Sequence, residues 1–266
     1  MAVKTTRRRS KGRNAGTAGR LLPPVIVLAA FIAFWEASVH LLRVETWILP
    51  APSDIAREAI AAGPRLIQHT LATVQLTLLG FAAGAAAGFV LAALLHLVPW
   101  AREGVYPLLV LSQNIPIVAI GPLLMIWFGF GLLPKLLLVM MVCFFPVSVA
   151  MLSGLAQSDP KLDNYMRMIG AGKARLFVSL ELPGAVPYLF SGLKIAASYS
   201  VLSAVVAEWL GSDRGLGYFM LLSSKGFQTA RVFAAVLVIV ALSLCMFGVI
   251  VLAQRLTMRW RPRKGE

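Results

Sequence analysis

Few side chains in this 266-residue sequence have the types and spacing that enzymatic chemistry needs. The stretch GAGKA at 170–174 is reminiscent of a phosphate-binding loop, which requires a glycine five residues before its Gly-Lys pair and a Ser or Thr after it. Arg167 and Ala174 occupy those two places. The glycine-rich stretches at 129–134 and 215–220 lack the third glycine of a dinucleotide-binding loop. We therefore predict no nucleotide or cofactor site in this chain.

Nucleophile, base and metal-ligand combinations are also missing from the sequence. The histidines His40, His69 and His96 are far apart and lack ligand spacing, and the two cysteines, Cys143 and Cys245, both lie in apolar runs where buried packing is the ordinary role. No Ser-His-Asp or Cys-His arrangement can be assembled from the spacing. The sequence predicts no catalytic residue, no metal site and no disulfide framework.

Three ionisable residues lie inside apolar runs, where such groups often mark proton or solute pathways: Glu36, Lys194 and Glu208. A proton relay through them is one interpretation. In the other, Glu36 is hydrated near the membrane boundary and Lys194 extends its amine toward the surface. Their different predicted depths favour separate roles.

The composition predicts an all-α integral membrane protein. Hydrophobic residues make up 59% of the chain and charged residues 14%, compared with roughly 25% charged in a soluble domain. The apolar runs are long enough to cross a hydrocarbon core. They predict a transmembrane domain over 21–256 with six spans, at about 21–42, 69–98, 105–130, 135–156, 186–210 and 231–254.

The polar segments complete this organisation. Residues 1–20 form a basic disordered tail that we expect in the cytoplasm, and residues 257–266 form a second basic tail. Between the first two spans, Ser53 or Asp54 is expected to cap a short surface helix. Residues 99–103 are expected to form a turn. The longest polar interruption is the loop at 157–185.

The third span is expected to be broken. It contains Pro107, Pro116 and Pro122, and the polar run Ser112-Gln113-Asn114 precedes Pro116. Proline removes a backbone hydrogen bond, and a broken helix is tolerated only where it lines protein or a watery path. The candidate path residues are Gln113, Asn114, Ser203 and Glu208. Structural kinking and helix–helix hydrogen bonds are the alternative interpretation.

Gly80, Gly84 and Gly88 recur at every fourth position of the second span. Small residues at this spacing form a flat face that allows another helix to approach closely. Packing within this chain is the expected role, and a dimer contact is the alternative.

The net charge of +14 is compatible with nucleic acid, but its distribution indicates membrane lipid instead. In the six-span arrangement, 17 of the 25 Lys and Arg residues lie on the side of both termini and of the 157–185 loop. Cytoplasmic segments carry such an excess. The prediction is that both termini and this loop are cytoplasmic, and that nucleic acid is not a partner.

The loop itself predicts two short amphipathic helices joined at 170–172. Asp159 can cap the first and Pro160 suits its first position. Leu162, Tyr165, Met166 and Ile169 recur at helical spacing and form an apolar stripe. A second helix is expected to end at Pro183.

At this loop the sequence resembles the permease subunits of ATP-binding-cassette importers. Gly170-Ala171, Leu182-Pro183 and Pro187 are similar to the "EAA" loop of that family, although Asn164-Tyr165-Met166 stand where Glu-Ala-Ala is usual. Three further stretches are similar to the sulfonate, taurine, nitrate and thiamin-pyrimidine branch: LPAPSD at 49–54, SQNIPIVAIGPLLMIWFGFG at 112–131 and AEWLGSDRGLGYFM at 207–220. FQTARVFAAVLVIVALSL at 227–244 is closer to pyrimidine- or riboflavin-type members.

The resemblance implies a type I (MetI-like) permease of the bacterial inner membrane, without catalysis of its own. It implies a second permease copy forming a homodimer, two ATPase subunits that use ATP and Mg²⁺, and a periplasmic or lipid-anchored binding protein. Nine residues are then expected at the ATPase contact: Asp163, Asn164, Tyr165, Met166, Arg167, Ile169, Gly170, Ala171 and Lys173. The alternatives are a proton-coupled secondary transporter or channel and, less favoured, an intramembrane enzyme.

Overall fold

The structure, a computed structural model, describes residues 17–258, with side chains described from residue 22 onward. Within that range all regular secondary structure is helical. The helices are α1 (Thr17–Leu41), α2 (Pro52–Ala61), α3 (Gly63–Leu97), α4 (Pro99–Ser112), α5 (Ile117–Phe128), α6 (Leu132–Leu155), α7 (Pro160–Met168), α8 (Lys173–Leu176), the π-helical turn η1 (Phe177–Glu181), α9 (Leu182–Trp209), α10 (Leu216–Lys225) and α11 (Thr229–Thr257).

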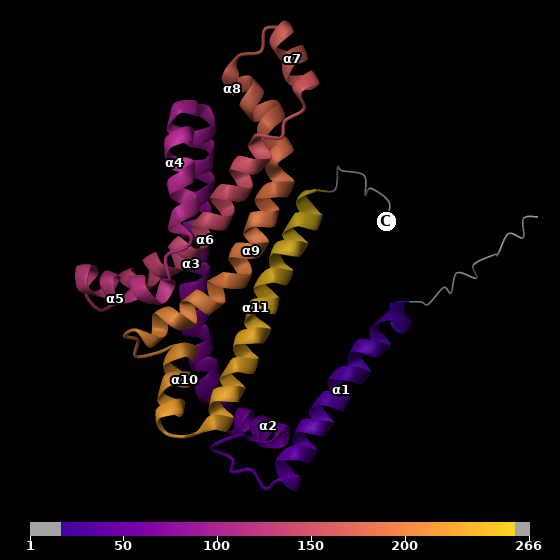
Figure 1. The fold of residues 1–266 in the computed structure, drawn as a ribbon, viewed down its shortest axis with the longest axis vertical. Helices are drawn as coiled ribbons and strands as arrows, with labels where there is room; N and C mark the ends of the chain where they lie inside the picture. Colours follow the sequence, from indigo (N-terminus) through magenta and orange to yellow (C-terminus); the bar gives the residue numbers. More distant parts are fainter. Residues whose placement is uncertain (1–16, 259–266) are drawn as a thin grey trace, which may run out of the picture.

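Five helical runs in the described part are long and apolar enough to cross a membrane, and the bent pair α4–α5 brings the total to six. The predicted all-α fold is confirmed, and so is the predicted number of six spans when the bent pair is counted as one span. Figure 1 shows α7, α8 and α4 at one end of the bundle and α2 and α10 at the opposite end. The amino end of α1 and the carboxyl end of α11 both point toward the α7 end, as the predicted topology requires.

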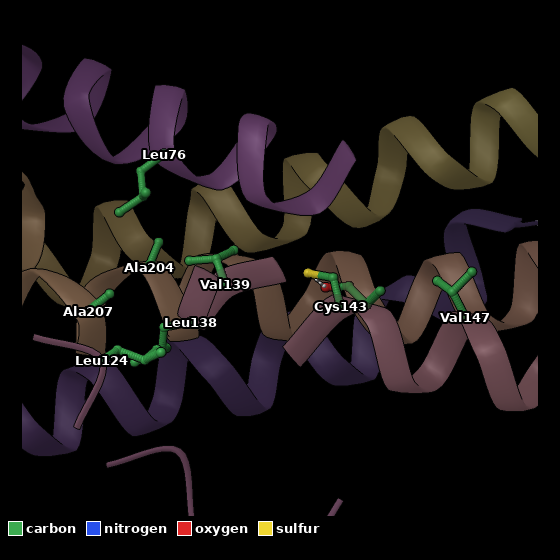
Figure 2. Packing of buried hydrophobic residues seen from close by; sticks show 9 residues of the cluster. Leu76, Leu124, Leu138, Val139, Cys143, Val147, Ala204 and Ala207 are labelled. Carbon is green, nitrogen blue, oxygen red and sulfur yellow. Dashed lines mark hydrogen bonds between the residues drawn. The ribbon is translucent and has the colours of Figure 1, made fainter. Parts of the chain in front are cut away.

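The centre of the fold consists of α3, α6 and α9, which pack along most of their lengths. Buried side chains from these helices and from α5 form a continuous apolar cluster that includes Leu76, Val139, Cys143 and Ala204 (Figure 2). By contrast, α1 projects away from this bundle and contacts it mainly through α2 (Figure 1). The side chains of α1 are largely exposed, as expected for a helix in contact with lipid or another subunit.

The small-residue face of α3 packs against α6 of the same chain. A Cβ added at Gly80 would lie 2.5 Å from Val139 Cγ1, and one added at Gly84 would lie 2.5 Å from the Met140 carbonyl oxygen. At Gly88 the nearest atom would be the Phe144 carbonyl oxygen at 2.7 Å. The expected packing within the chain is therefore confirmed.

The predicted break in the third span lies at residues 113–116. Helix α4 ends at Ser112, α5 begins at Ile117, and the two axes are bent by 103°. Figure 1 shows α5 running outward from the bundle rather than continuing α4. The predicted break in residues 105–130 therefore has its expected cause, because Pro116 fixes an extended backbone before α5.

The helix that follows α7 is longer than expected. Residues 173–209 form one helical run through α8, η1 and α9, so the prediction that Pro183 ends a helix is wrong. Leu182 N–H bonds to the Phe177 carbonyl in the wider π-helical spacing. This change of hydrogen-bond register just before Pro183 accommodates a residue that has no N–H to donate.

Several predicted boundaries also shift. Residues 17–20 extend α1, because each added residue gains a backbone hydrogen bond. Pro99 begins α4, a position that proline favours, so residues 99–103 are helical rather than a turn. Residues 63–68 belong to α3. The rest of the two predicted tails, 1–16 and 259–266, lies outside the described residues.

The cap of α2 also differs from the prediction. Ala51 occupies the cap position, and neither Ser53 nor Asp54 caps the helix. Instead Glu36 of α1 accepts hydrogen bonds from the Ser53 backbone N–H at 3.0 Å and from the Ser53 hydroxyl at 2.6 Å. A carboxylate at a helix N-terminus is favourable, so Glu36 has a structural partner at the junction of α1 and α2.

Candidate functional site: an exposed coupling segment and an uncharged cavity

The segment 159–173, which we call the coupling segment, joins α6 to the α8–η1–α9 run. Asp159 Oδ1 accepts a hydrogen bond from Lys161 N–H at 2.9 Å, and Pro160 is the first helical residue, as predicted. At the other end Gly170 has φ +82°. Gly170 N–H bonds to the Arg167 carbonyl and Ala171 N–H to the Met166 carbonyl, the pair of bonds that defines a Schellman motif. These caps hold α7 as a defined short helix.

No residue of α7 is buried against the rest of this chain. Leu162, Tyr165, Met168 and Ile169 are all exposed, with Met168 reaching 79%. Met168 was not part of the predicted stripe, although its spacing from Tyr165 could have identified it, and Met166 is half-buried instead. An unpaired apolar face of this kind at a water-facing loop indicates an interaction surface.

The nine residues expected at an ATPase contact all lie on this one segment. Asp163 and Arg167 form an ion pair along α7, with Arg167 Nε 3.1 Å from both carboxylate oxygens. Hydrogen bonding and charge from Asp163 raise the pKa of Arg167. Asn164, Tyr165, Ile169, Gly170 and Lys173 are exposed, whereas Asp163, Met166 and Ala171 are half-buried.

A cavity of about 530 Å³ lies where α4 breaks toward α5 and faces α6 and α9. Its lining contains no charged side chain, and its polar residues are Ser112, Gln113 and Tyr199. Pro146 also lines it and cannot donate to the Val142 carbonyl, so one backbone acceptor of α6 lacks its helical donor. The remaining lining is apolar: Ile115, Ile117, Ile120, Leu138, Met141, Val142, Phe145, Val149, Ala150 and Ile195.

The four predicted path residues are not brought together. Gln113 lines the cavity, whereas Asn114 donates to the Val110 carbonyl at 3.2 Å and so finishes α4. Ser203 is buried and donates to the Ser200 carbonyl at 2.9 Å within α9. Glu208 lies at the α10 end of the bundle, away from this cavity.

Glu208 instead belongs to a buried polar cluster, which we call the α10 lock. Its Oε1 accepts from the Thr73 hydroxyl at 2.8 Å and its Oε2 from Gly217 N–H at 2.7 Å. Thr73 Oγ1 in turn accepts from Leu216 N–H at 2.8 Å. The first amides of α10 are thereby satisfied by side chains of α9 and α3, which fixes the α9–α10 turn onto α3.

Sequence reasoning found Glu208 but missed Thr73, which is 135 residues away from it in the chain. It also missed His69, whose Nδ1 accepts from Gly215 N–H at 3.1 Å. Nothing in local spacing marks such long-range pairs. The salt bridges among residues 22–258 join none of Glu36, Lys194 and Glu208 to one another, so the geometry does not assemble the proposed relay.

Thr73 and Thr77 provide a matched test of the α10 lock. Both are buried on the same face of α3, but Thr77 Oγ1 has no hydrogen-bond partner in the described structure. We expect Thr73→Val to destabilise the α9–α10 turn by about 1–3 kcal/mol, because it leaves one oxygen of the buried Glu208 carboxylate and the Leu216 amide unpaired. Thr77→Val should be neutral or stabilising. Hydrogen exchange at Leu216 and Gly217 measures this, and equal exchange in the two variants would contradict the lock.

Comparison with known proteins identifies the class. Residues 80–259 match the family described as "Binding-protein-dependent transport system inner membrane component". A "Probable ABC transporter permease protein" of Haemophilus influenzae is 34% identical, covering 86% of this chain and 93% of that protein. This chain therefore belongs to the binding-protein-dependent ABC transporter permease family, a class of multi-pass membrane proteins.

Two further relatives have named substrates. The formylaminopyrimidine transport permease ThiX of Halalkalibacterium halodurans is 30% identical, covering 91% of this chain and 97% of the relative. The riboflavin transport system permease RibX of Chloroflexus aurantiacus is 31% identical, covering 88% of each chain. A crystal structure described as an amino acid ABC transporter with histidines has the same fold, with a TM-score of 0.60 and 17% identity over 77% of this chain and 97% of that one.

Proposed function

We propose that this chain is the membrane subunit of an ATP-driven importer that brings a small organic solute into the cytoplasm across the bacterial inner membrane. The observation that carries the proposal is α7, a capped helix that has no buried residue and that exposes Tyr165 and Met168, together with its C-cap residue Ile169. Covering that face with a partner subunit removes apolar surface from water. The loop position and the family membership support an ATPase as the partner.

The complete transporter then contains two copies of this permease, two ATPase subunits and a periplasmic or lipid-anchored binding protein. ATP and Mg²⁺ bind to the ATPase subunits, and this chain carries no cofactor and performs no catalysis. ATP binding favours one orientation of the permease pair, because the ATPases contact α7 differently in each state. Tyr165, Met168 and Ile169 supply the apolar part of that contact, and Arg167 and Lys173 its charges.

We further propose that the cavity beside the α4–α5 break forms one wall of the solute path. A permanently anionic solute that moves from water onto this wall would find no cation to pair with. Placing an unpaired charge in an apolar environment costs free energy. The amide of Gln113 and the hydroxyls of Ser112 and Tyr199 instead suit hydrogen bonding to an uncharged solute. The ring of Phe145 offers a stacking surface. These features favour an uncharged heteroaromatic compound, such as a pyrimidine or flavin, over a sulfonate, taurine or nitrate.

Uptake into vesicles tests the proposal. The chain is co-expressed with the ATPase and binding protein encoded beside it, and the assembled complex is reconstituted with radiolabelled pyrimidine, riboflavin, taurine and alkanesulfonate. We expect uptake of an uncharged aromatic solute that stops when ATP is withheld. Replacing Gln113 with Leu should lower it roughly tenfold, because one hydrogen bond to the solute is lost.

The outcomes separate the two parts of the proposal. Uptake that continues without ATP, in a chain that never co-purifies with an ATPase, excludes the importer function. ATP-dependent uptake restricted to a sulfonate or nitrate leaves the importer function standing and excludes the assigned solute class.

A further inference from the structure

The geometry points to His96 and Glu181 as a positioning pair that transmits movement of the coupling segment to α3. This inference rests on the proposed importer function. It concerns the contact between the last turn of α3 and η1, which we call the α3 joint and define by His96, Phe177 and Glu181. These residues take no part in the predicted ATPase contact or in the cavity lining.

The α3 joint is a long-range contact at the base of the coupling segment. His96 Nε2 lies 2.8 Å from Glu181 Oε2, and the two side chains are only 15% and 13% exposed. The His96 ring also packs on Phe177, with centroids 6.0 Å apart and planes inclined by 33°. One histidine is thus held by two residues of the same π-helical turn.

Movement of α7 has few routes into this chain. Because no residue of α7 is buried, a docked partner acts on the bundle mainly through the two ends of α7. Arg167 of α7 also interacts electrostatically with Glu181. One end leads into α6, and the other leads through Gly170 into α8, η1 and α9. The α3 joint lies on the second route, where Phe177 packs against the apolar cluster that includes Ala92, Leu95 and Leu155.

Helix α3 can carry this movement to the opposite end of the bundle. Its 35 residues span about 52 Å as a regular helix. At the α7 end it is tied to η1 through His96, and at the α10 end it is tied to the α9–α10 turn through Thr73 and His69. A displacement of η1 that moves His96 is therefore transmitted along α3 to the α9–α10 turn at the opposite end of the bundle. We infer that the α3 joint makes α3 follow the coupling segment.

Exchange of the two residues tests this inference in the full transporter. His96→Leu and Glu181→Leu each remove the pairing, and the double variant His96→Glu/Glu181→His restores a pair with the positions reversed. We expect each single variant to lower solute transported per ATP hydrolysed by about tenfold, and the reversed pair to regain at least half of it. His40→Leu is the matched control, since His40 forms an exposed pair with Glu36 in the last turns of α1. Figure 1 shows that this end of α1 lies beside α2, opposite the α7 end of the bundle.

Two outcomes overturn the inference. In the first, the single variants transport with wild-type coupling. In the second, transport and co-purification with the ATPase fall in the same proportion in the single variants and in the reversed pair, which assigns the contact to folding alone. The ATP-dependence of wild-type uptake is measured in the same vesicles. Failure of the importer proposal is thereby distinguished from failure of the inference about the α3 joint.

Discussion

Replacement of Gly170 by tryptophan is expected to abolish ATP-driven uptake, while replacement by asparagine retains most of it. Gly170 has φ +82°, a conformation that costs most side chains about 1 kcal/mol or more and that asparagine tolerates best. A Cβ at this position meets nothing within 4 Å in this chain. The bulk of tryptophan therefore extends toward whatever covers α7, rather than into the permease.

The comparison of the two variants separates backbone strain from blocked docking. Uptake and co-purification with the ATPase are measured for both, and we expect at least a tenfold loss of each for tryptophan, as for disruption of an interface anchor. A second control is Gly172→Trp, because Gly172 also has open space around its Cβ but an ordinary backbone. Normal uptake by the Gly170→Trp variant would show that Gly170 is not part of the ATPase contact.

The second large effect is expected at the close contact of α3 with α6. Gly84→Ala places a methyl group 2.5 Å from the Met140 carbonyl oxygen and 2.8 Å from Cys143 Cβ, and a helix backbone cannot yield locally. The helices must separate, at a cost of about 1–3 kcal/mol. The apparent Tm of the purified protein should fall by roughly 3–10 °C.

Gly248→Ala provides the matched control for that experiment. Gly248 lies within α11, and a Cβ there meets nothing within 4 Å. Alanine is the better helix former by about 1 kcal/mol, so this variant should be as stable as wild type or more so. If the Gly84→Ala and Gly248→Ala variants have the same apparent Tm, the close approach of α3 and α6 does not determine stability.

The features that could be predicted from the sequence have local causes. Hydrophobic run length predicted the five long apolar helices and the apolar α4–α5 pair. Pro116 predicted the break after α4, and the spacing of Gly80, Gly84 and Gly88 predicted a packed face. The Asp159-Pro160 pair likewise predicted the start of α7. Each of these depends on residues within about one helical turn or one span, where sequence spacing and geometry coincide.

The features that were missed depend on pairs distant in the sequence. Glu36 caps α2 from α1, Thr73 meets Glu208 across 135 residues, and His96 meets Glu181 across 85. No periodicity connects such partners. Pro183 was misjudged for a different reason: the π-helical turn η1 changes the hydrogen-bond register just before it, so the helix continues through a residue that has no N–H to donate.

The short helices α4 and α5 have a consequence for how the protein is made. They contain 14 and 12 residues, so each is only about 20 Å long, whereas the hydrocarbon core is about 30 Å thick. Neither can be released into lipid as an independent crossing while the chain is being synthesised. Because Ile117, Ile120 and Leu124 of α5 pack in the apolar cluster that contains Leu138 of α6, we infer that the bent pair reaches its place in the bilayer only after α6 has been synthesised. Membrane integration of this region is thus a step taken by α4, α5 and α6 together.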